Sequence, residues 1–218
     1  MPASNNAHRD DRSAIASLGR SIATLLAAHH YRDPFTVEHQ YRTAELSAAI
    51  AVELGLSPLD VAVLRLAASV HDIGKIAVPA EILFRPGTLS DVEYAVIKTH
   101  SSISQTILQR LESPFAVAEI AAQHHERLDG SGYPRGLRAA EILPGARILA
   151  VADVFDAMTS KRPYRDGLPT DFVLGELHDM ADRLLDADAV AACRNYILRR
   201  EVAPATAISD TRASKSSD

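Results

Sequence analysis

The chain has 218 residues, enough for one domain of ordinary size with a well-formed core. Apolar residues make up 47% of it, but there is no tryptophan and only 5% is aromatic, which argues against stacking on single-stranded nucleic acid. The formal net charge of -5 argues against an extended surface for a nucleic-acid polymer, so we expect no such partner. A local basic pocket for phosphate stays compatible with this charge.

The cysteine content and the N-terminus favour a cytoplasmic protein. Cys193 is the only cysteine, so it forms no internal disulfide and builds no thiolate metal site. The N-terminal residues are polar and lack the apolar core of a signal peptide. No stretch reaches the roughly 18 apolar residues that span a bilayer, so we expect no membrane insertion.

The first predicted helices follow a disordered start at residues 1–12. An amphipathic helix is predicted around Leu18–Leu26, and the Asp33-Pro34 step interrupts it. The next helix is predicted to run from about Phe35 to Leu54 and to end near a glycine. We therefore expect the domain to begin at about residue 13.

Helix-start signals then recur along the middle of the chain. Ser57-Pro58 opens a predicted helix that reaches about His71. Ser90 and Glu93 form a capping box at the head of a longer helix. Ser113-Pro114 is predicted to open another helix, which ends near residue 126.

The last part of the chain completes an all-α pattern. A loop rich in Gly and Pro is predicted at 127–144, a helix at about 147–160, and two more helices within 170–200. The tail at 203–218 has no periodic pattern and is predicted to be disordered. With no internal repeat and no alternating strand, we expect a single all-α domain at 13–202.

Histidines and aspartates carry the chemical signal. Most of them lie near predicted helix ends or on apolar helices: His39, His71, Asp72, His100, His124, His125 and Asp153. A single such histidine is more often an ordinary surface residue, and a buried aspartate is more often paired with arginine or a helix end. Together, however, seven imidazole and carboxylate groups suit first-row metals and exceed the needs of one zinc. The pattern therefore indicates a pair of metal ions.

Four segments carry a resemblance to the HD-GYP family, a branch of the HD metal-dependent phosphohydrolase superfamily. They occur in the family's order and spacing: His71-Asp72-Ile73-Gly74-Lys75, His124 to Pro134 (HHERLDGSGYP), Val151 to Ala157 (VADVFDA) and Arg162-Pro163-Tyr164-Arg165. The resemblance covers roughly residues 28–197, and the second segment is very specific. It implies an all-helical bundle of about seven helices with a metal centre at its middle.

The resemblance also implies the ligand set. The seven histidines and aspartates named above would bind two divalent ions, iron or manganese, with Asp72 bridging them. Some members hold a third metal through a glutamate one turn before the first ligand histidine. Here that position is Phe35, which cannot coordinate a metal, so we expect two ions rather than three.

The implied activity is hydrolysis of cyclic di-GMP to pGpG and/or GMP by metal-activated hydroxide. Asp72 and Lys75 would be the catalytic residues, and Lys75, Tyr133, Arg162 and Arg165 would bind substrate. The simpler interpretation of Lys75 is a lysine paired with nearby carboxylates. Tyr133 either stacks on a guanine or packs against its own loop. Asp156, three residues after Asp153, is expected to orient a ligand histidine, and Glu126 to do likewise.

Other interpretations stay open. Ser104 stands where the family has a glycine, which is expected to change local packing. One rival is a receptor that binds cyclic di-GMP without cleaving it, and another is an HD hydrolase acting on a different nucleotide. We expect no sensory domain within the chain, and the sequence leaves open a homodimer or a regulatory protein partner. His29, His30 and His178 match no family ligand and are expected at the surface or an interface.

Overall fold

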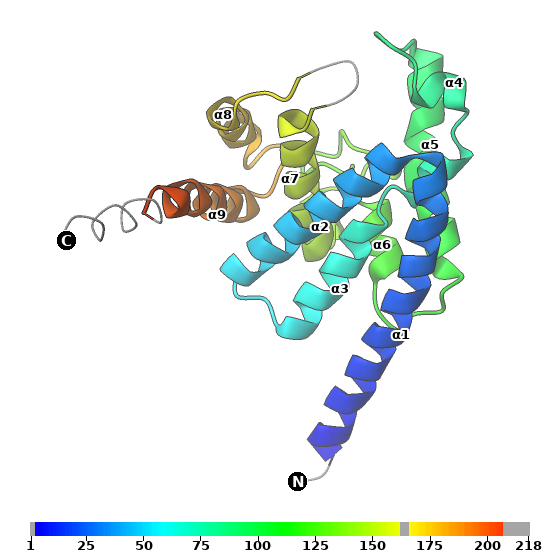
Figure 1. Cartoon of the computed structure of the whole chain (residues 1–218), viewed down its shortest axis with the longest axis vertical. Helices are drawn as coiled ribbons and strands as arrows, with labels where there is room; N and C mark the ends of the chain where they lie inside the picture. Colours follow the sequence, from blue (N-terminus) through cyan, green and yellow to red (C-terminus); the bar gives the residue numbers. More distant parts are fainter. Residues whose placement is uncertain (1–2, 162–165, 207–218) are drawn as a thin grey trace, which may run out of the picture.

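The fold consists of helices joined by turns and loops, in a computed structural model that describes residues 3–161 and 166–206 (Figure 1). The α-helices of these residues are α1 (Ala3–Arg32), α2 (Pro34–Glu53), α3 (Pro58–Ser69), α4 (Ala80–Leu83), α5 (Asp91–Gln109), α6 (Val117–Ala122), α7 (Pro144–Thr159), α8 (Thr170–Met180) and α9 (Ala187–Thr206). Two short 3-10 helices accompany them, η1 (Ile73–Ala77) and η2 (Ala139–Glu141). Only isolated bridges and no strand occur in this part of the chain, which confirms the all-α single domain.

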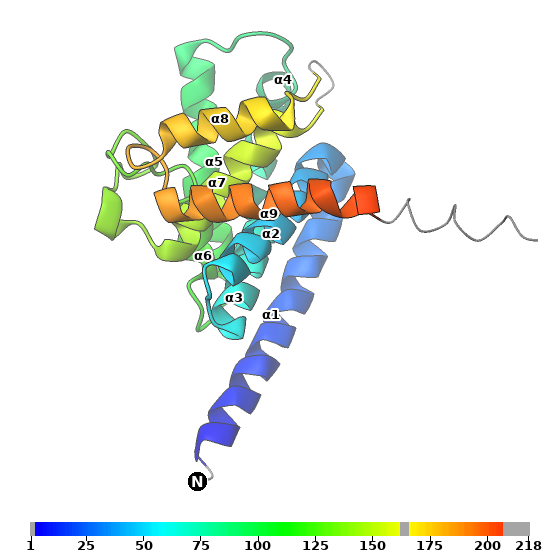
Figure 2. The ribbon, with the colours of Figure 1, turned by 90° about the vertical axis from the view of Figure 1, so that its left-hand side faces the viewer.

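Helix α2 lies at the middle of the bundle. It packs against α1, α3, α7 and α9, and Figure 2 shows α9 crossing in front of it. Its inner face includes Ala44, Ile50 and Ala51, all fully or almost fully buried. Small alanines let neighbouring helices approach closely, so residues in the middle of α2 come near residues from α3 and α7.

The helix starts agree with most of the predicted capping signals. Ser57 caps α3 as predicted. Asp33, which was not predicted as a cap, accepts the Thr36 N–H at 3.0 Å and caps α2. The capping box of Ser90 and Glu93 is present at the head of α5. Ser113 differs from the prediction, because its hydroxyl accepts the Phe115 N–H at 3.1 Å and α6 begins only at Val117.

The helical region extends beyond the predicted ends of the domain. Helix α1 begins at Ala3 rather than near residue 13, and α9 continues to Thr206. The C-terminal half of α1 is anchored by Leu18, Ile22 and Leu26, which are buried, whereas its N-terminal half projects from the bundle (Figures 1 and 2). Nine α-helices lie in the described segments instead of about seven, and the four-residue α4 lies where no helix was predicted. None of these described helices is long and apolar enough to cross a membrane.

Candidate metal centre

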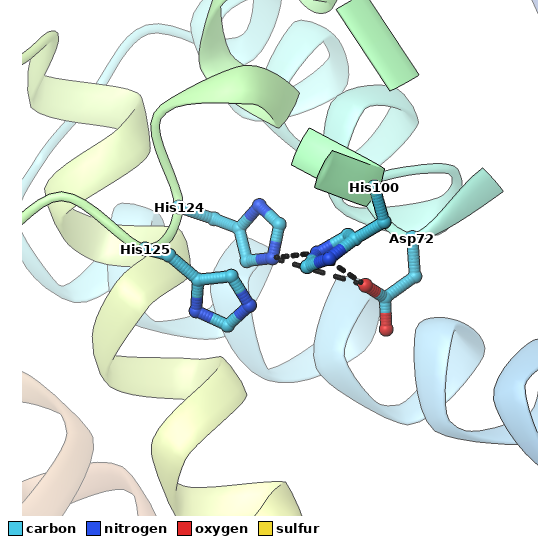
Figure 3. Close-up of side chains that lie close together, drawn as sticks. All are labelled: Asp72, His100, His124 and His125. Atoms are coloured by element: carbon cyan, nitrogen blue, oxygen red, sulfur yellow. Dashed lines mark hydrogen bonds and ion pairs between the residues drawn. The ribbon is translucent and has the colours of Figure 1, made fainter. Parts of the chain in front are cut away.

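Seven histidine and aspartate side chains meet at the centre of the bundle. They form two groups, and the potential ligand atoms of each group lie within 4.8 Å of one another. One group is His39, His71 and Asp153; the other is Asp72, His100, His124 and His125 (Figure 3). The structure thus brings together all seven residues named from the sequence, and their role as metal ligands stays a prediction.

Helix ends explain how two adjacent pairs both face the centre. Neighbouring residues within a helix point in different directions. The pair His71-Asp72 follows the end of α3, and the pair His124-His125 follows the end of α6, so each pair lies in a turn. There the backbone can direct both side chains of a pair inward.

Asp72 lies between the two groups and is almost completely buried. Its Oδ1 is 3.1 Å from His100 Nε2, whereas its Oδ2 is 3.4 Å from His71 Nε2. One carboxylate oxygen therefore faces each group. This is the arrangement that a carboxylate shared by two cations requires.

Three of the histidines are held in one tautomer by their own helices. Each Nδ1 lies close to the carbonyl oxygen three residues earlier: His71 to Ala68 at 2.7 Å, His100 to Ile97 at 2.7 Å and His124 to Ala121 at 2.6 Å. Because a carbonyl oxygen only accepts, each Nδ1–H donates. When these rings are neutral, each Nε2 keeps its lone pair and points into the centre, as metal coordination needs.

His39 is oriented by a carboxylate instead. Its Nδ1 is 2.6 Å from Asp156 Oδ2, and its Nε2 is 3.0 Å from Asp153 Oδ1. Arg42 donates to both oxygens of Asp156, through Nε at 2.7 Å and Nη2 at 3.0 Å. The predicted contact between Asp156 and a ligand histidine is therefore confirmed, and Arg42 holds Asp156 in place.

The donor set fits a metal. Oδ1 of Asp72 and Nε2 of His71 are buried and make no hydrogen bond of acceptable geometry with any residue that the structure describes. Buried polar atoms normally have partners, so such atoms in one cluster call for a ligand. Imidazole nitrogens and carboxylate oxygens are the ligands that iron, manganese and zinc accept. These side chains therefore fit divalent metal ions, and either group could hold one.

Burial and charge set the protonation of the cluster. Burial lowers the pKa of His124 well below its usual value and that of His125 to about 3, so both stay neutral. Burial also lowers the pKa of His71, but the carboxylates of Asp72 and Asp153 outweigh it and raise this pKa to about 10. Without metal, His71 therefore carries a proton that a bound cation would displace.

Comparison with known proteins identifies the family. A family model described as HD domain matches residues 23–189 of the chain. The chain belongs to the HD domain family. This confirms the family resemblance drawn from the sequence motifs.

Curated proteins and solved structures similar to this HD domain are phosphodiesterases and HD proteins. A cyclic di-GMP phosphodiesterase of Thermotoga maritima is 45% identical over 164 residues, which cover 74% of this chain and 45% of that protein. A 3'3'-cGAMP-specific phosphodiesterase 1 of Vibrio cholerae is 44% identical over 169 residues, covering 77% of this chain and 39% of that protein. The chain thus spans less than half the length of either relative. Bd1817, an HDG"Y"P protein of Bdellovibrio bacteriovorus, shares the fold, with a TM-score of 0.64 at 23% identity, over 87% of this chain and 62% of that one.

Of the four residues predicted to bind substrate, two lie beside the candidate metal centre and two lie outside the described residues. Lys75 Nζ lies 2.6 Å from Asp72 Oδ2, so the simpler pairing with a carboxylate is present at the edge of the centre. The Tyr133 ring packs against His125, with centroids 4.6 Å apart, and burial raises the pKa of its hydroxyl. Arg162 and Arg165 lie outside the described residues.

The glycine-rich loop is held against the centre by its backbone. A Cβ at Gly132 would lie 2.5 Å from His125 O, so only glycine permits this approach. The prediction for Glu126 is wrong. Its buried carboxylate makes no hydrogen bond to a histidine of the cluster and instead accepts the N–H groups of Arg135 at 2.8 Å and Leu137 at 2.9 Å. Glu126 thus anchors the loop rather than an imidazole.

Ser104 joins η1 to α5. Its hydroxyl accepts the Gly74 N–H at 2.9 Å and donates to His71 O at 2.7 Å. A Cβ at Gly74 would lie 2.1 Å from His100 O, so the two elements are in close contact. The local packing that was expected to differ at Ser104 therefore contains two buried hydrogen bonds, close to His71 and His100.

Sequence reasoning missed several supporting residues. Gln40 accepts the Asp72 N–H at 3.1 Å, and Arg42 holds Asp156, yet neither follows a motif of its own. The sequence alone carried no signal for either residue, because their partners lie on other elements of the fold. The surface expectation for His29 is wrong in part, because its side chain is fully buried with neither ring nitrogen hydrogen-bonded. Burial of His29 lowers its pKa, so it stays neutral.

Proposed function

We propose that this HD domain is a metal-dependent phosphodiesterase that hydrolyses cyclic di-GMP to pGpG and/or GMP. The observation that carries the proposal is the position of Asp72 between the two sets of histidines. Its Oδ1 faces His100, and its Oδ2 faces His71 of the other group. The similarity to a cyclic di-GMP phosphodiesterase at 45% identity supports the substrate class. Iron or manganese, two ions per chain, is the proposed cofactor.

The chain's own residues would divide the work at this centre. Bound divalent ions supply positive charge for the phosphate oxygens and make water acidic enough to attack at neutral pH. The histidines would provide Nε2 lone pairs in fixed positions. Asp72 would offer one carboxylate oxygen to each group of ligands. Lys75, at the edge of the centre, would contact the phosphate or stabilise the departing ribose oxygen.

Three further side chains are proposed to bind substrate. Arg162 and Arg165 suit phosphate oxygens because a guanidinium donates two parallel hydrogen bonds. Tyr133 packs on His125 and would hold that ligand while its edge borders the substrate. Lys98 lies 5.5 Å from the Tyr133 ring centroid and adds positive charge on the same side.

The second candidate substrate is 3'3'-cGAMP. A 3'3'-cGAMP-specific phosphodiesterase is 44% identical to the chain, nearly as similar as the cyclic di-GMP relative. Both molecules present the same phosphodiester ring and differ in one base. The two candidates therefore require the same metal centre and separate only at the base-binding site.

The test is a turnover assay on the full chain. The protein is purified without oxygen, supplied with Fe²⁺ or Mn²⁺, and incubated with cyclic di-GMP or 3'3'-cGAMP, and products are separated by chromatography. We expect pGpG or GMP from cyclic di-GMP with wild type and none with Asp72→Ala. Metal binding and cyclic di-GMP binding without any product would contradict an enzyme and favour the receptor. Product from Asp72→Ala at the wild-type rate would exclude this centre as the catalyst.

A further inference from the structure

A cavity of about 540 Å³ opens beside the metal centre. The start of α2, η1, α4 and the end of α7 provide its walls, and His39, Lys75 and Asp156 of the centre line it. Its volume falls within the roughly 300–1,000 Å³ range of small-molecule sites. A molecule held at the centre would therefore extend into this cavity.

One face of α2 contributes three side chains of different chemistry to the cavity. Phe35, Glu38 and Arg42 are spaced by three and four residues, so they lie on the same side of the helix. Phe35 is 60% exposed and lines the cavity, so its ring is open to contact with a ligand. Such a ring offers a flat surface for stacking.

The carboxylates of the cavity differ in what they already bind. Asp33 accepts from the Thr36 N–H and hydroxyl, and Asp156 binds His39 and Arg42. Within the part of the chain that the structure describes, Glu38 is exposed and makes no hydrogen bond or close ion pair; its carboxylate interacts with Arg42 only at longer range. Among the carboxylates of the cavity, it is therefore the one most available to a ligand.

We infer that this cavity binds one guanine of the substrate, with the base stacked on Phe35 and its N1–H and N2–H groups donating to the Glu38 carboxylate. The inference rests on the proposed function, because the base is taken to belong to a dinucleotide whose phosphate lies at the metal centre. Lys75, which lines the same cavity and lies 2.6 Å from Asp72 Oδ2, supplies positive charge on the side of the metal centre.

The chemistry of the two purines explains why Glu38 would discriminate. The Watson–Crick edge of guanine has two adjacent donors, which match the two oxygens of a carboxylate. Adenine presents an acceptor at N1, which a carboxylate repels. Stacking on Phe35 favours both bases alike, because every base has a π-face. Glu38 therefore sets the choice of base, and Phe35 sets affinity.

Equilibrium binding of GMP and AMP to the full chain, with Mn²⁺ supplied, tests this inference. We expect wild type to bind GMP more tightly than AMP. The substitution Glu38→Gln is expected to reduce that preference by about tenfold or more, because a charge-assisted pair of hydrogen bonds is lost. The substitution Phe35→Leu is expected to weaken both nucleotides by about fivefold or more without changing their ratio.

Glu45→Gln is the matched control, since Glu45 lies on the same helix, is exposed and pairs with Arg65 away from the cavity. It is expected to bind both nucleotides like wild type. Equal binding of GMP and AMP by wild type, or an unchanged preference in Glu38→Gln, would overturn the inference. If the preference depends on Glu38 but no cyclic dinucleotide is cleaved, the guanine site stands and the proposed catalysis fails.

Discussion

The orientation of His39 depends on residues that bind no metal themselves. Its Nδ1 contacts Asp156, and Asp156 is held by two hydrogen bonds from Arg42, so the imidazole is fixed at one end of a chain of three side chains. Without Arg42, the Asp156 carboxylate would be free to turn. Partners of this kind contribute to metal affinity because they fix the ring and raise its basicity.

We expect Arg42→Ala to weaken metal binding by about 10- to 100-fold. Titration with Mn²⁺ against a competing chelator measures this change. The control is Arg65→Ala, which removes an exposed arginine that pairs with Glu45 and should leave the affinity as in wild type. Equal metal affinity in the Arg42 and Arg65 variants would show that Asp156 needs no arginine.

Cys193 provides a second test at the residue scale. Burial raises the pKa of this thiol to about 12, so the reactive thiolate is scarce in the folded chain at pH 8. We expect a thiol reagent at pH 8 to react with the native protein far more slowly than with the protein in urea, where one thiol reacts per chain. Rapid native reaction at pH 8 would contradict the buried position of α9 against the bundle.

The sequence was sufficient for the seven clustered residues but not for all of their supports. Histidines and aspartates beside helix ends stand out as types, and the motif spacing located them. Asp156 could be predicted because a spacing of three from Asp153 places both on one helix face. Arg42 and Gln40 could not, since an arginine and a glutamine on an apolar helix look like ordinary polar residues until α7 and η1 are placed beside α2.

At the scale of the elements, the contact between η1 and α5 positions three of the clustered residues. Ser104 binds the backbone on both sides of the His71-Asp72 turn, and His100 lies one turn earlier on the same helix. Both hydrogen bonds are buried. A serine therefore fixes the distance between two parts of the centre.

We expect Ser104→Ala to destabilise the protein by about 1–3 kcal/mol, because it leaves a buried N–H and a buried carbonyl without their partner. Urea unfolding of the full chain measures this loss. Ser102→Ala, on the exposed side of α5, should lie within about 0.5 kcal/mol of wild type. A loss no larger in Ser104→Ala than in Ser102→Ala would contradict the bridging role, because alanine itself favours the helix at both positions.

Element boundaries were predicted less well than element types. Capping residues located the starts of α3 and α5, because their hydrogen bonds are local, and the Asp33-Pro34 step located the start of α2. The same reasoning failed at Ser113, where the hydroxyl closes a short turn and α6 starts later. The polar start of α1 has no apolar periodicity, so its helix from Ala3 could not be inferred from a core-facing stripe.

At the scale of the whole molecule, the candidate metal centre connects α2, α5 and α7 with the turns after α3 and α6. Ions that bind only the native arrangement stabilise it by mass action. With free metal at 100 times its Kd, one site adds about 2.7 kcal/mol. We expect Mn²⁺ to raise the Tm of wild type and to leave the Tm of Asp72→Ala nearly unchanged. An equal rise in both would mean that metal binds elsewhere.

The central claim is that catalysis needs both groups of ligands, and a metal titration of activity tests it most directly. Metal-free protein at a known concentration receives Mn²⁺ or Fe²⁺ in steps without oxygen, and hydrolysis of cyclic di-GMP is followed at each step. The account predicts that activity rises to a plateau at about two ions per chain, one for each group of ligands. Full activity in the metal-free chain, or a plateau at one ion per chain, would contradict it.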